Sequence, residues 1–138
     1  MANKPLYVEM PIDVKTYDID FGGIVSNIVY VRWLEDLRLR MLDTYFPLKS
    51  QTEAGYAPVL VRTDIRYHRA VKLHDKPVGA VWVRTVGRFK AHLEGYISLD
   101  GTVVASFGQT VVFAEFTSGK PIPLPERLRS LYERGAQW

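Results

Sequence analysis

The sequence predicts an α+β domain in which one antiparallel sheet curls around a single long central helix. One strongly apolar helical pattern extends over about residues 28–46, and four segments with strand character follow it with short turns between them. Strands joined so briefly pair antiparallel. A helix that is apolar over most of its circumference has to be buried. A sheet wrapped around that helix satisfies both requirements.

The length and composition indicate a soluble globular chain. Its 138 residues fit a single domain, residues 1–138, with a sizeable core. Hydrophobic residues make up 47% and charged residues 24%, close to the globular average. The net charge of +3 comes without a dense Lys/Arg run, so we expect no nucleic-acid partner. No signal peptide and no apolar stretch of about 18 residues is present, so we expect no membrane association and a cytoplasmic location.

The N-terminal half contains the first predicted strand and the helix. The strand is predicted over residues 6–17, and a turn over residues 19–26 leads into the helix. Apolar residues then recur at helical spacing, at Val29, Tyr30, Trp33, Leu34, Leu37 and Met41. Pro47 ends the helix because proline cannot continue its hydrogen bonding. A largely polar loop is expected over residues 49–56.

The C-terminal half is predicted to be mainly strand. Alternating apolar and polar residues, with many β-branched side chains, indicate half-buried strands over residues 59–69, 78–86, 88–99 and 102–116. Asp100-Gly101 is a pair that tight two-residue hairpins prefer. Pro125 suits the first turn of a short final helix, with Gly135 as its stop.

The stretch 17–30 places two carboxylates, Asp18 and Asp20, and the glycine pair 22–23 directly before the long helix. The start of a helix exposes unpaired N–H groups and a partial positive charge. Such a place can hold a carbonyl oxygen that becomes negative during a reaction, and a nearby carboxylate can activate its attacker. Asp also commonly caps turns, and from the residues alone that structural role is favoured for Asp20. For Asp18 a structural role is the main expectation.

This motif resembles the hot-dog-fold thioesterases of the 4-hydroxybenzoyl-CoA thioesterase type. That family has an acidic motif, D-x-D-x-x-G-[IV]-V, followed by a Tyr on the central helix. The matching residues are Asp18, Asp20, Gly23, Ile24, Val25 and Tyr30, with further similarity at Glu35, Arg38, Tyr67, Asp75 and the proline-rich tail 119–125. The resemblance implies a hot-dog fold and hydrolysis of an acyl-CoA or aroyl-CoA thioester to acid and free coenzyme A. We also expect a homodimer or homotetramer, because pairing two chains would cover the second sheet face and the free sheet edges. The acyl group would reach Asp20 through a pocket shared between subunits.

The resemblance implies catalytic roles for residues at the helix start. Asp20 would act as nucleophile or as general base for water. The N–H groups of Gly23, Ile24 or Val25 would stabilise the oxyanion. Asn27 would orient water or hold the acyl carbonyl, although capping of the helix by Ser26 or Asn27 is the more favoured role.

Substrate contacts are expected elsewhere. Tyr30 is either a core residue or part of the acyl pocket. Arg88 and Lys90 either meet the phosphates of coenzyme A or are ordinary surface charges. The chain has no cysteine, and His68 and His92 lie on polar strand faces without ligand-type neighbours, so we expect no metal. No cofactor is expected beyond the coenzyme A of the substrate.

Two alternatives remain open. Ser26-Asn27 resembles the Asn-Asn pair of acyl-carrier-protein and long-chain acyl-CoA thioesterases, which usually have His where this chain has Ile24. An acyl-carrier-protein thioester is therefore an alternative substrate. A hot-dog protein that binds an acyl ligand without turnover is the other alternative, and the intact Asp20 and Gly23 count against it.

Overall fold

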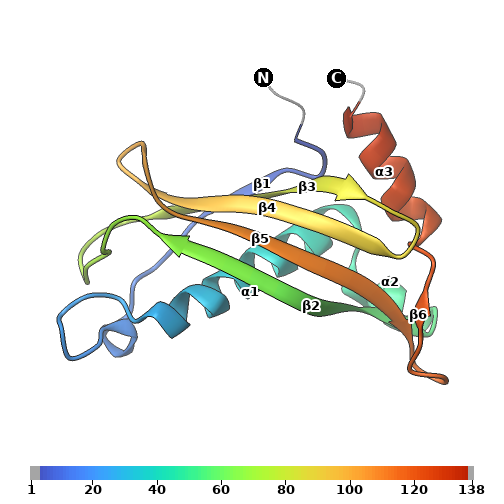
Figure 1. Ribbon diagram of the computed structural model, residues 1–138, viewed down its shortest axis with the longest axis horizontal. Helices are drawn as coiled ribbons and strands as arrows, with labels where there is room; N and C mark the ends of the chain where they lie inside the picture. Colours follow the sequence, from blue (N-terminus) through green and yellow to red (C-terminus); the bar gives the residue numbers. More distant parts are fainter. Residues whose placement is uncertain (1–3, 137–138) are drawn as a thin grey trace.

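The computed structural model describes residues 4–136, which form one sheet and the helices that pack on it (Figure 1). The strand order is β1-β3-β4-β5-β2, with β6 paired to β5, and all pairings are antiparallel. The elements in chain order are β1 (Val8–Pro11), the 3₁₀ turn η1 (Thr16–Asp18), α1 (Asn27–Tyr45), α2 (Leu48–Glu53), β2 (Tyr56–Tyr67), β3 (Val78–Val86), β4 (Lys90–Leu99), β5 (Thr102–Glu115), β6 (Pro121–Ile122) and α3 (Glu126–Ala136).

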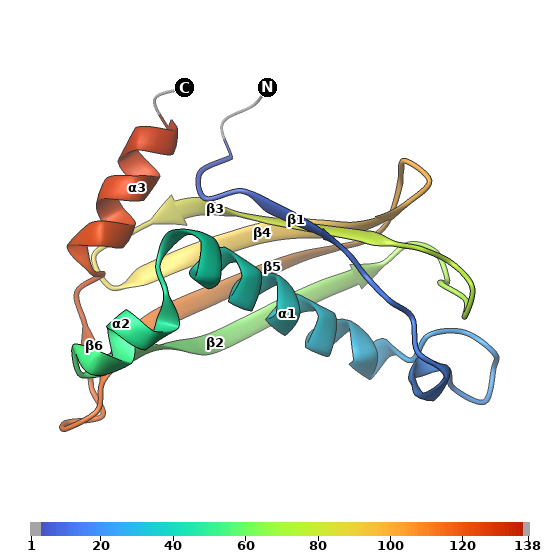
Figure 2. The same ribbon diagram turned by 180° about the vertical axis from the view of Figure 1, so that it is seen from behind.

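Helix α1 lies across one face of the sheet, as expected (Figure 2). The predicted stripe is its buried face, formed by Val29, Tyr30, Trp33, Leu34, Leu37 and Met41. The expectation that the helix is buried over most of its circumference is wrong. Ile28 is 75% exposed, and Val31 and Leu39 are also exposed. Helix α1 therefore carries apolar side chains on a face that this chain does not cover.

Strand β2 lies at one edge of the sheet, where it pairs only with β5. The expected half-burial fails for Val61, which is 53% exposed, and for Tyr67, which is 43% exposed. The register shifts between Leu60 and Arg62, which makes a β-bulge at Val61. An edge strand has no neighbour to shield its outer side, and this explains why the alternation in the sequence overestimated burial.

Three other predicted boundaries are wrong. The first strand is limited to β1, because Leu6 has a left-handed backbone with φ 57° and cannot be part of a strand. The polar loop predicted over residues 49–56 contains α2, in which the buried Gln51 amide donates to the carbonyl of Phe46 at 2.9 Å. Gly135 does not stop the last helix but lies inside α3, where an added Cβ would be 2.9 Å from Pro5 Cα.

Gly95 in β4 is required by close packing. A Cβ there would lie 2.2 Å from the carbonyl oxygen of Ala80 and 2.3 Å from Phe107 Cζ. We expect Gly95→Ala to lower the free energy of unfolding by about 3 kcal/mol or more, because overpacking against backbone cannot relax through rotamers. Urea denaturation measures this. Gly108→Ala is the matched control, because its Cβ meets only Leu93 O at 3.8 Å, and an equal loss in both variants would contradict the packing argument.

Candidate active site

The loop of residues 19–26 joins η1 to α1 and holds the acidic motif. An isolated antiparallel bridge pairs Ile19 with Val25 and closes the loop. The N–H of Asp20 donates to Ile24 O at 2.9 Å, and the N–H of Gly23 donates to Asp20 O at 3.0 Å. Gly23 has φ 80°, a left-handed conformation in which glycine carries no Cβ penalty. The motif therefore forms a tight turn with a fixed backbone.

The half-buried Asp20 carboxylate is oriented by its own turn. Its Oδ1 accepts a hydrogen bond from the N–H of Gly22 at 2.8 Å. A Cβ at position 22 would lie 3.3 Å from the same oxygen, so a glycine there leaves room for the carboxylate. None of the ion pairs found within residues 4–136 involves Asp20. The turn-capping role and a catalytic role are compatible, because capping uses one oxygen and leaves the other available.

Asp18 has the structural role that the sequence predicts. It is buried, and its Oδ2 accepts a hydrogen bond from the N–H of Lys15 at 2.8 Å. Arg32 Nη1 on α1 lies 4.0 Å from its Oδ1. The backbone carbonyl of Asp18 accepts a hydrogen bond from the N–H of Ser26 at 2.9 Å. Asp18 therefore fixes the acidic loop against the start of α1.

The start of α1 has no side-chain cap. Ser26 is at the N-cap position, but its side chain makes no capping hydrogen bond. Asn27 is already helical and is exposed. The expected side-chain capping by Ser26 or Asn27 is therefore wrong. The N–H of Val29 donates to Ser26 O at 3.0 Å, whereas within residues 4–136 the N–H groups of Asn27 and Ile28 have no acceptor and remain open to a ligand.

The three expected oxyanion donors differ in whether their N–H groups already have an acceptor within the chain. The N–H of Gly23 donates to Asp20 O, and the N–H of Val25 donates to Val71 O at 2.8 Å. Both are therefore committed within the chain. Within residues 4–136, the N–H of Ile24 has no acceptor. Of the three expected donors, the N–H of Ile24 is thus the one that remains available beside the Asp20 turn.

Tyr30 is a core residue below the helix start. Its ring centroid lies 4.9 Å from that of Trp33 and 5.0 Å from that of Tyr67. Burial, with a smaller contribution from Tyr67, raises the pKa of Tyr30 to about 12. The hydroxyl of Tyr67 donates to Asn27 O at 3.0 Å, which joins β2 to the first residue of α1. Tyr30 thus packs in the core beneath the first turn of α1, and it does not line the cavity under the C-terminal half of that helix.

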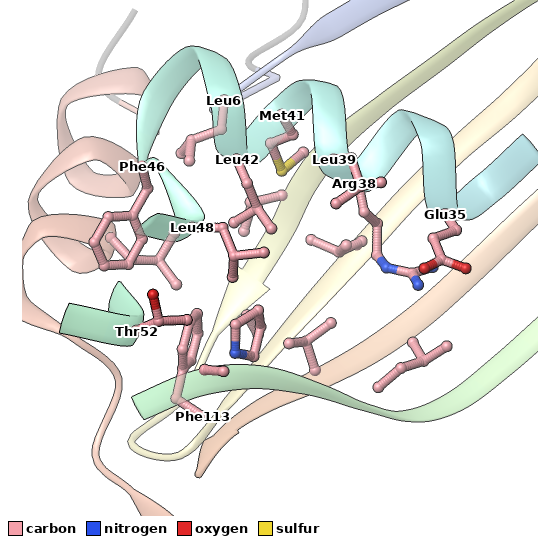
Figure 3. Close-up of a pocket in the computed structure, with 18 residues that line it drawn as sticks. Leu6, Glu35, Arg38, Leu39, Met41, Leu42, Phe46, Leu48, Thr52 and Phe113 are labelled. Carbon is pink, nitrogen blue, oxygen red and sulfur yellow. The ribbon is translucent and has the colours of Figure 1, made fainter. Parts of the chain in front are cut away.

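A cavity of about 310 Å³ lies under the C-terminal half of α1 (Figure 3). Apolar side chains from all three helices and from strands β2 to β5 line it, and Glu35 and Arg38 are the charged residues in its wall. Its size is at the lower end of the range for small-molecule sites. Asp20 does not line this cavity. Within one chain, the carboxylate and the apolar cavity are therefore separate.

A polar network borders this cavity, and the sequence interpretation missed it. Arg38 Nη1 donates to Gln109 Oε1 at 3.0 Å, and Gln109 Nε2 donates to Thr63 Oγ1 at 3.1 Å. Burial lowers the pKa of the Arg38 guanidinium below its usual value. The signal in the sequence was Gln109, a polar residue at an inward position of the β5 alternation, and the structure shows that this side chain is buried.

Arg88 and Lys90 lie at the other end of the molecule from Asp20. Arg88 lies in the turn between β3 and β4 and Lys90 begins β4, whereas the acidic loop lies at the opposite end of α1 (Figure 1). Both side chains are exposed, and the Arg88 guanidinium lies 5.3 Å from the Phe89 ring centroid. A ligand bound at Asp20 of the same chain would have to span the length of α1 to contact them.

Two of the three histidines form hydrogen bonds with neighbouring hydroxyl groups. His68 Nε2 lies 2.9 Å from Ser106 Oγ, and His92 Nδ1 lies 3.1 Å from Thr110 Oγ1. Across residues 4–136, no cluster of three His, Asp or Glu side chains has the geometry to hold a metal ion. In the same residues, no helix is both long enough and apolar enough to cross a membrane.

One antiparallel sheet wrapped around a long helix, with an acidic turn at the helix start, defines the hot-dog class of α+β domain. The chain superposes on the structure of the DHNA-CoA thioesterase from Staphylococcus aureus with a TM-score of 0.85. That match covers 93% of this chain and 89% of the other at 16% identity. The hot-dog fold implied by the sequence resemblance is confirmed.

The chain belongs to the thioesterase-like superfamily, whose family model matches residues 14–131. A thioesterase from Thermus thermophilus, solved in complex with coenzyme A and Zn, is 27% identical, with a TM-score of 0.83 and coverage of 100% of this chain and 98% of that one. A Synechocystis protein whose name provisionally assigns it as an esterase is 25% identical over 92 residues. That match covers 66% of this chain and spans about half of the relative, 55% of its length.

Proposed function

We propose that this protein hydrolyses acyl-CoA thioesters, with Asp20 as the catalytic carboxylate. The observation that carries the proposal is the half-buried Asp20 carboxylate held in a fixed turn beside the uncapped start of α1. Thioester hydrolysis requires an attacking oxygen on one side of the carbonyl and hydrogen-bond donors for the oxyanion on the other. The acidic loop and the helix start supply both within one short segment.

The proposed reaction uses Asp20 in one of two ways. As a general base, the carboxylate takes a proton from water, and the resulting hydroxide adds to the thioester carbon. As a nucleophile, it adds directly and forms an anhydride that water then cleaves. In both routes the carbonyl oxygen becomes negative and accepts hydrogen bonds from the N–H groups of Ile24, Asn27 and Ile28. The carbonyl then reforms as the C–S bond breaks. In both routes the proton lost by water ends on the departing coenzyme A thiolate and the Asp20 carboxylate is regenerated, so the products are the acid and the coenzyme A thiol. No metal or redox cofactor takes part in the proposed reaction.

The active form is proposed to be a dimer joined through the β2 edges. Val59, Leu60 and Val61 leave apolar surface on this edge strand, which has unpaired backbone groups. Exposed Ile28, Val31 and Leu39 on α1 and the fully exposed Phe21 at the tip of the acidic loop add to the uncovered apolar surface. A second copy related by a two-fold axis would cover both surfaces at once.

Such a dimer would bring together the parts that one chain separates. Tyr67, at the end of β2, contacts the start of α1 near Asp20, whereas Ala57 and Pro58, at its beginning, line the cavity. Antiparallel pairing of the two β2 strands places the end of one beside the beginning of the other. The acidic loop of one chain would then face the cavity of the partner. It would also face the β3–β4 turn of the partner, which carries the partner's Arg88 and the partner's Lys90. These two cations are proposed to meet the coenzyme A phosphates.

The test is a hydrolysis screen with purified protein and aromatic, short-chain and long-chain acyl-CoA substrates, with detection of the released thiol. We expect turnover with at least one substrate class. Matched acyl-carrier-protein thioesters in the same screen test the alternative substrate that Asn27 suggests. Tight acyl-CoA binding without any thiol release would favour the non-catalytic alternative and reject the hydrolase proposal.

A further inference from the structure

The cavity crosses the width of the sheet and is closed at its inner end. Its strand wall runs from Leu60 on β2 through Val111 on β5 and Leu93 on β4 to Val83 on β3. The β2 end is the sheet edge, where the proposed partner and the reacting thioester lie. The opposite end, beyond β3, is closed by Leu6 from the N-terminal segment and Leu128 from α3, both of which line the cavity and are buried.

Leu6 is held there in an unfavourable backbone conformation. Its φ is 57°, a left-handed value that non-glycine residues avoid because Cβ approaches the following carbonyl. Its side chain is only 7% exposed. A hydrogen bond from Val83 N–H to Pro5 O, 2.8 Å long, fixes the segment against β3. The surrounding structure therefore forces a strained residue into the end of the pocket, a situation associated with functional sites.

A cation–π cluster on the outer face of the sheet holds the same segment from the other side. Lys4 Nζ lies 4.4 Å from the Trp82 ring centroid, 5.7 Å from that of Tyr7 and 5.8 Å from that of Tyr96. The Tyr7 hydroxyl donates to Glu9 Oε2 at 2.8 Å. Three aromatic rings around one ammonium group form a strong cation-binding arrangement. Lys4 and Tyr7 thus anchor the chain two residues before and one residue after Leu6.

We propose that Leu6 is a specificity-determining residue that sets the longest acyl chain the pocket accepts. This inference rests on the proposed function, because it takes the cavity as the acyl site. The substrate class it defines is a saturated straight-chain acyl thioester whose terminal methyl group ends against Leu6 and Leu128. A longer chain has to displace the anchored segment, so its additional methylene groups remain outside the apolar pocket.

The experiment compares kcat/KM over a series of straight-chain acyl-CoA substrates for the wild-type protein and for Leu6→Gly. Glycine adopts φ 57° without the Cβ penalty, so this variant removes the end wall and keeps the backbone path. The ratio of kcat/KM for a chain two carbons longer than the wild-type optimum to that for the optimum should rise about tenfold, from the burial of two further methylene groups. Asp100→Gly is the matched control, because Asp100 also has a left-handed φ, 51°, in the β4–β5 turn away from the cavity.

The outcomes separate the two proposals. A shift to longer chains in Leu6→Gly, with none in Asp100→Gly, supports the end wall. Leu128→Ala and Lys4→Ala should shift the chain-length profile of kcat/KM in the same direction. If Leu6→Gly does not fold, these two variants test the end-wall proposal in its place. An unchanged length profile in the folded variants overturns the inference while leaving hydrolysis intact. If the wild-type protein hydrolyses nothing, the proposed function fails, and calorimetric binding of fatty acids of increasing length still tests the depth of the cavity in the same variants.

Discussion

Asp20→Asn is expected to lower kcat for acyl-CoA hydrolysis at least about 10³-fold, with little change in the fold. An asparagine keeps an oxygen that can accept the hydrogen bond from Gly22 N–H, so the turn remains closed. It cannot take a proton from water at neutral pH, nor form an anhydride with the acyl group. The chemical step therefore loses its base or nucleophile, while the cavity and the oxyanion donors remain.

Steady-state kinetics with thiol detection measures this effect, and circular dichroism with thermal melting checks the fold. Asp13→Asn is the matched control, because Asp13 is an exposed acid on the segment before η1 and its replacement removes the same charge. Its kcat should stay within about twofold of the wild type, since surface substitutions rarely disturb a distant site. Asp20→Asn with near wild-type turnover would exclude Asp20 from the mechanism.

Local periodicity was enough to predict the central helix and most of the sheet. The helical spacing of Leu34, Leu37 and Met41 predicts the buried face of α1, because that spacing is set by helix geometry. The strand predicted over residues 78–86 matches β3, and the Asp100-Gly101 pair forms the turn between β4 and β5 with φ 51° and 80°. These features depend only on neighbouring residues.

Features that depend on long-range contacts could not be predicted in this way. The exposure of Val61 follows from the place of β2 at the sheet edge, which alternation does not encode. The left-handed backbone of Leu6 is imposed by Val83 and the cation–π cluster around Lys4. At the site, the motif indicated Asp20 and three alternative oxyanion donors, the N–H groups of Gly23, Ile24 and Val25. Only the folded structure shows that the N–H groups of Gly23 and Val25 already donate within the chain.

Val61→Lys is expected to convert the protein to a monomer and to lower activity at least about 100-fold, even though Asp20 is untouched. Val61 lies in the bulge of the β2 edge and is exposed in a single chain. In a two-fold interface each copy would bring a lysine close to the other, and edge lysines oppose strand pairing. Sedimentation equilibrium measures the mass, and the kinetic assay is run at the same protein concentration. Val103→Lys, at an exposed valine of β5, is the control that should stay dimeric and active.

The shared site can be tested further by mixing two inactive variants. Asp20→Asn lacks the carboxylate, and Leu42→Trp fills the cavity from the half-buried side of α1. A mixed dimer would combine the intact Asp20 of one chain with the intact cavity of the other at one of its two sites. After equal mixing and exchange, about half of the dimers are mixed, so activity should recover to about a quarter of the wild-type value. Mixed dimers that form, as seen by native mass spectrometry, but remain inactive would mean that carboxylate and cavity act within one chain, and the β2 pairing would lose its role in catalysis.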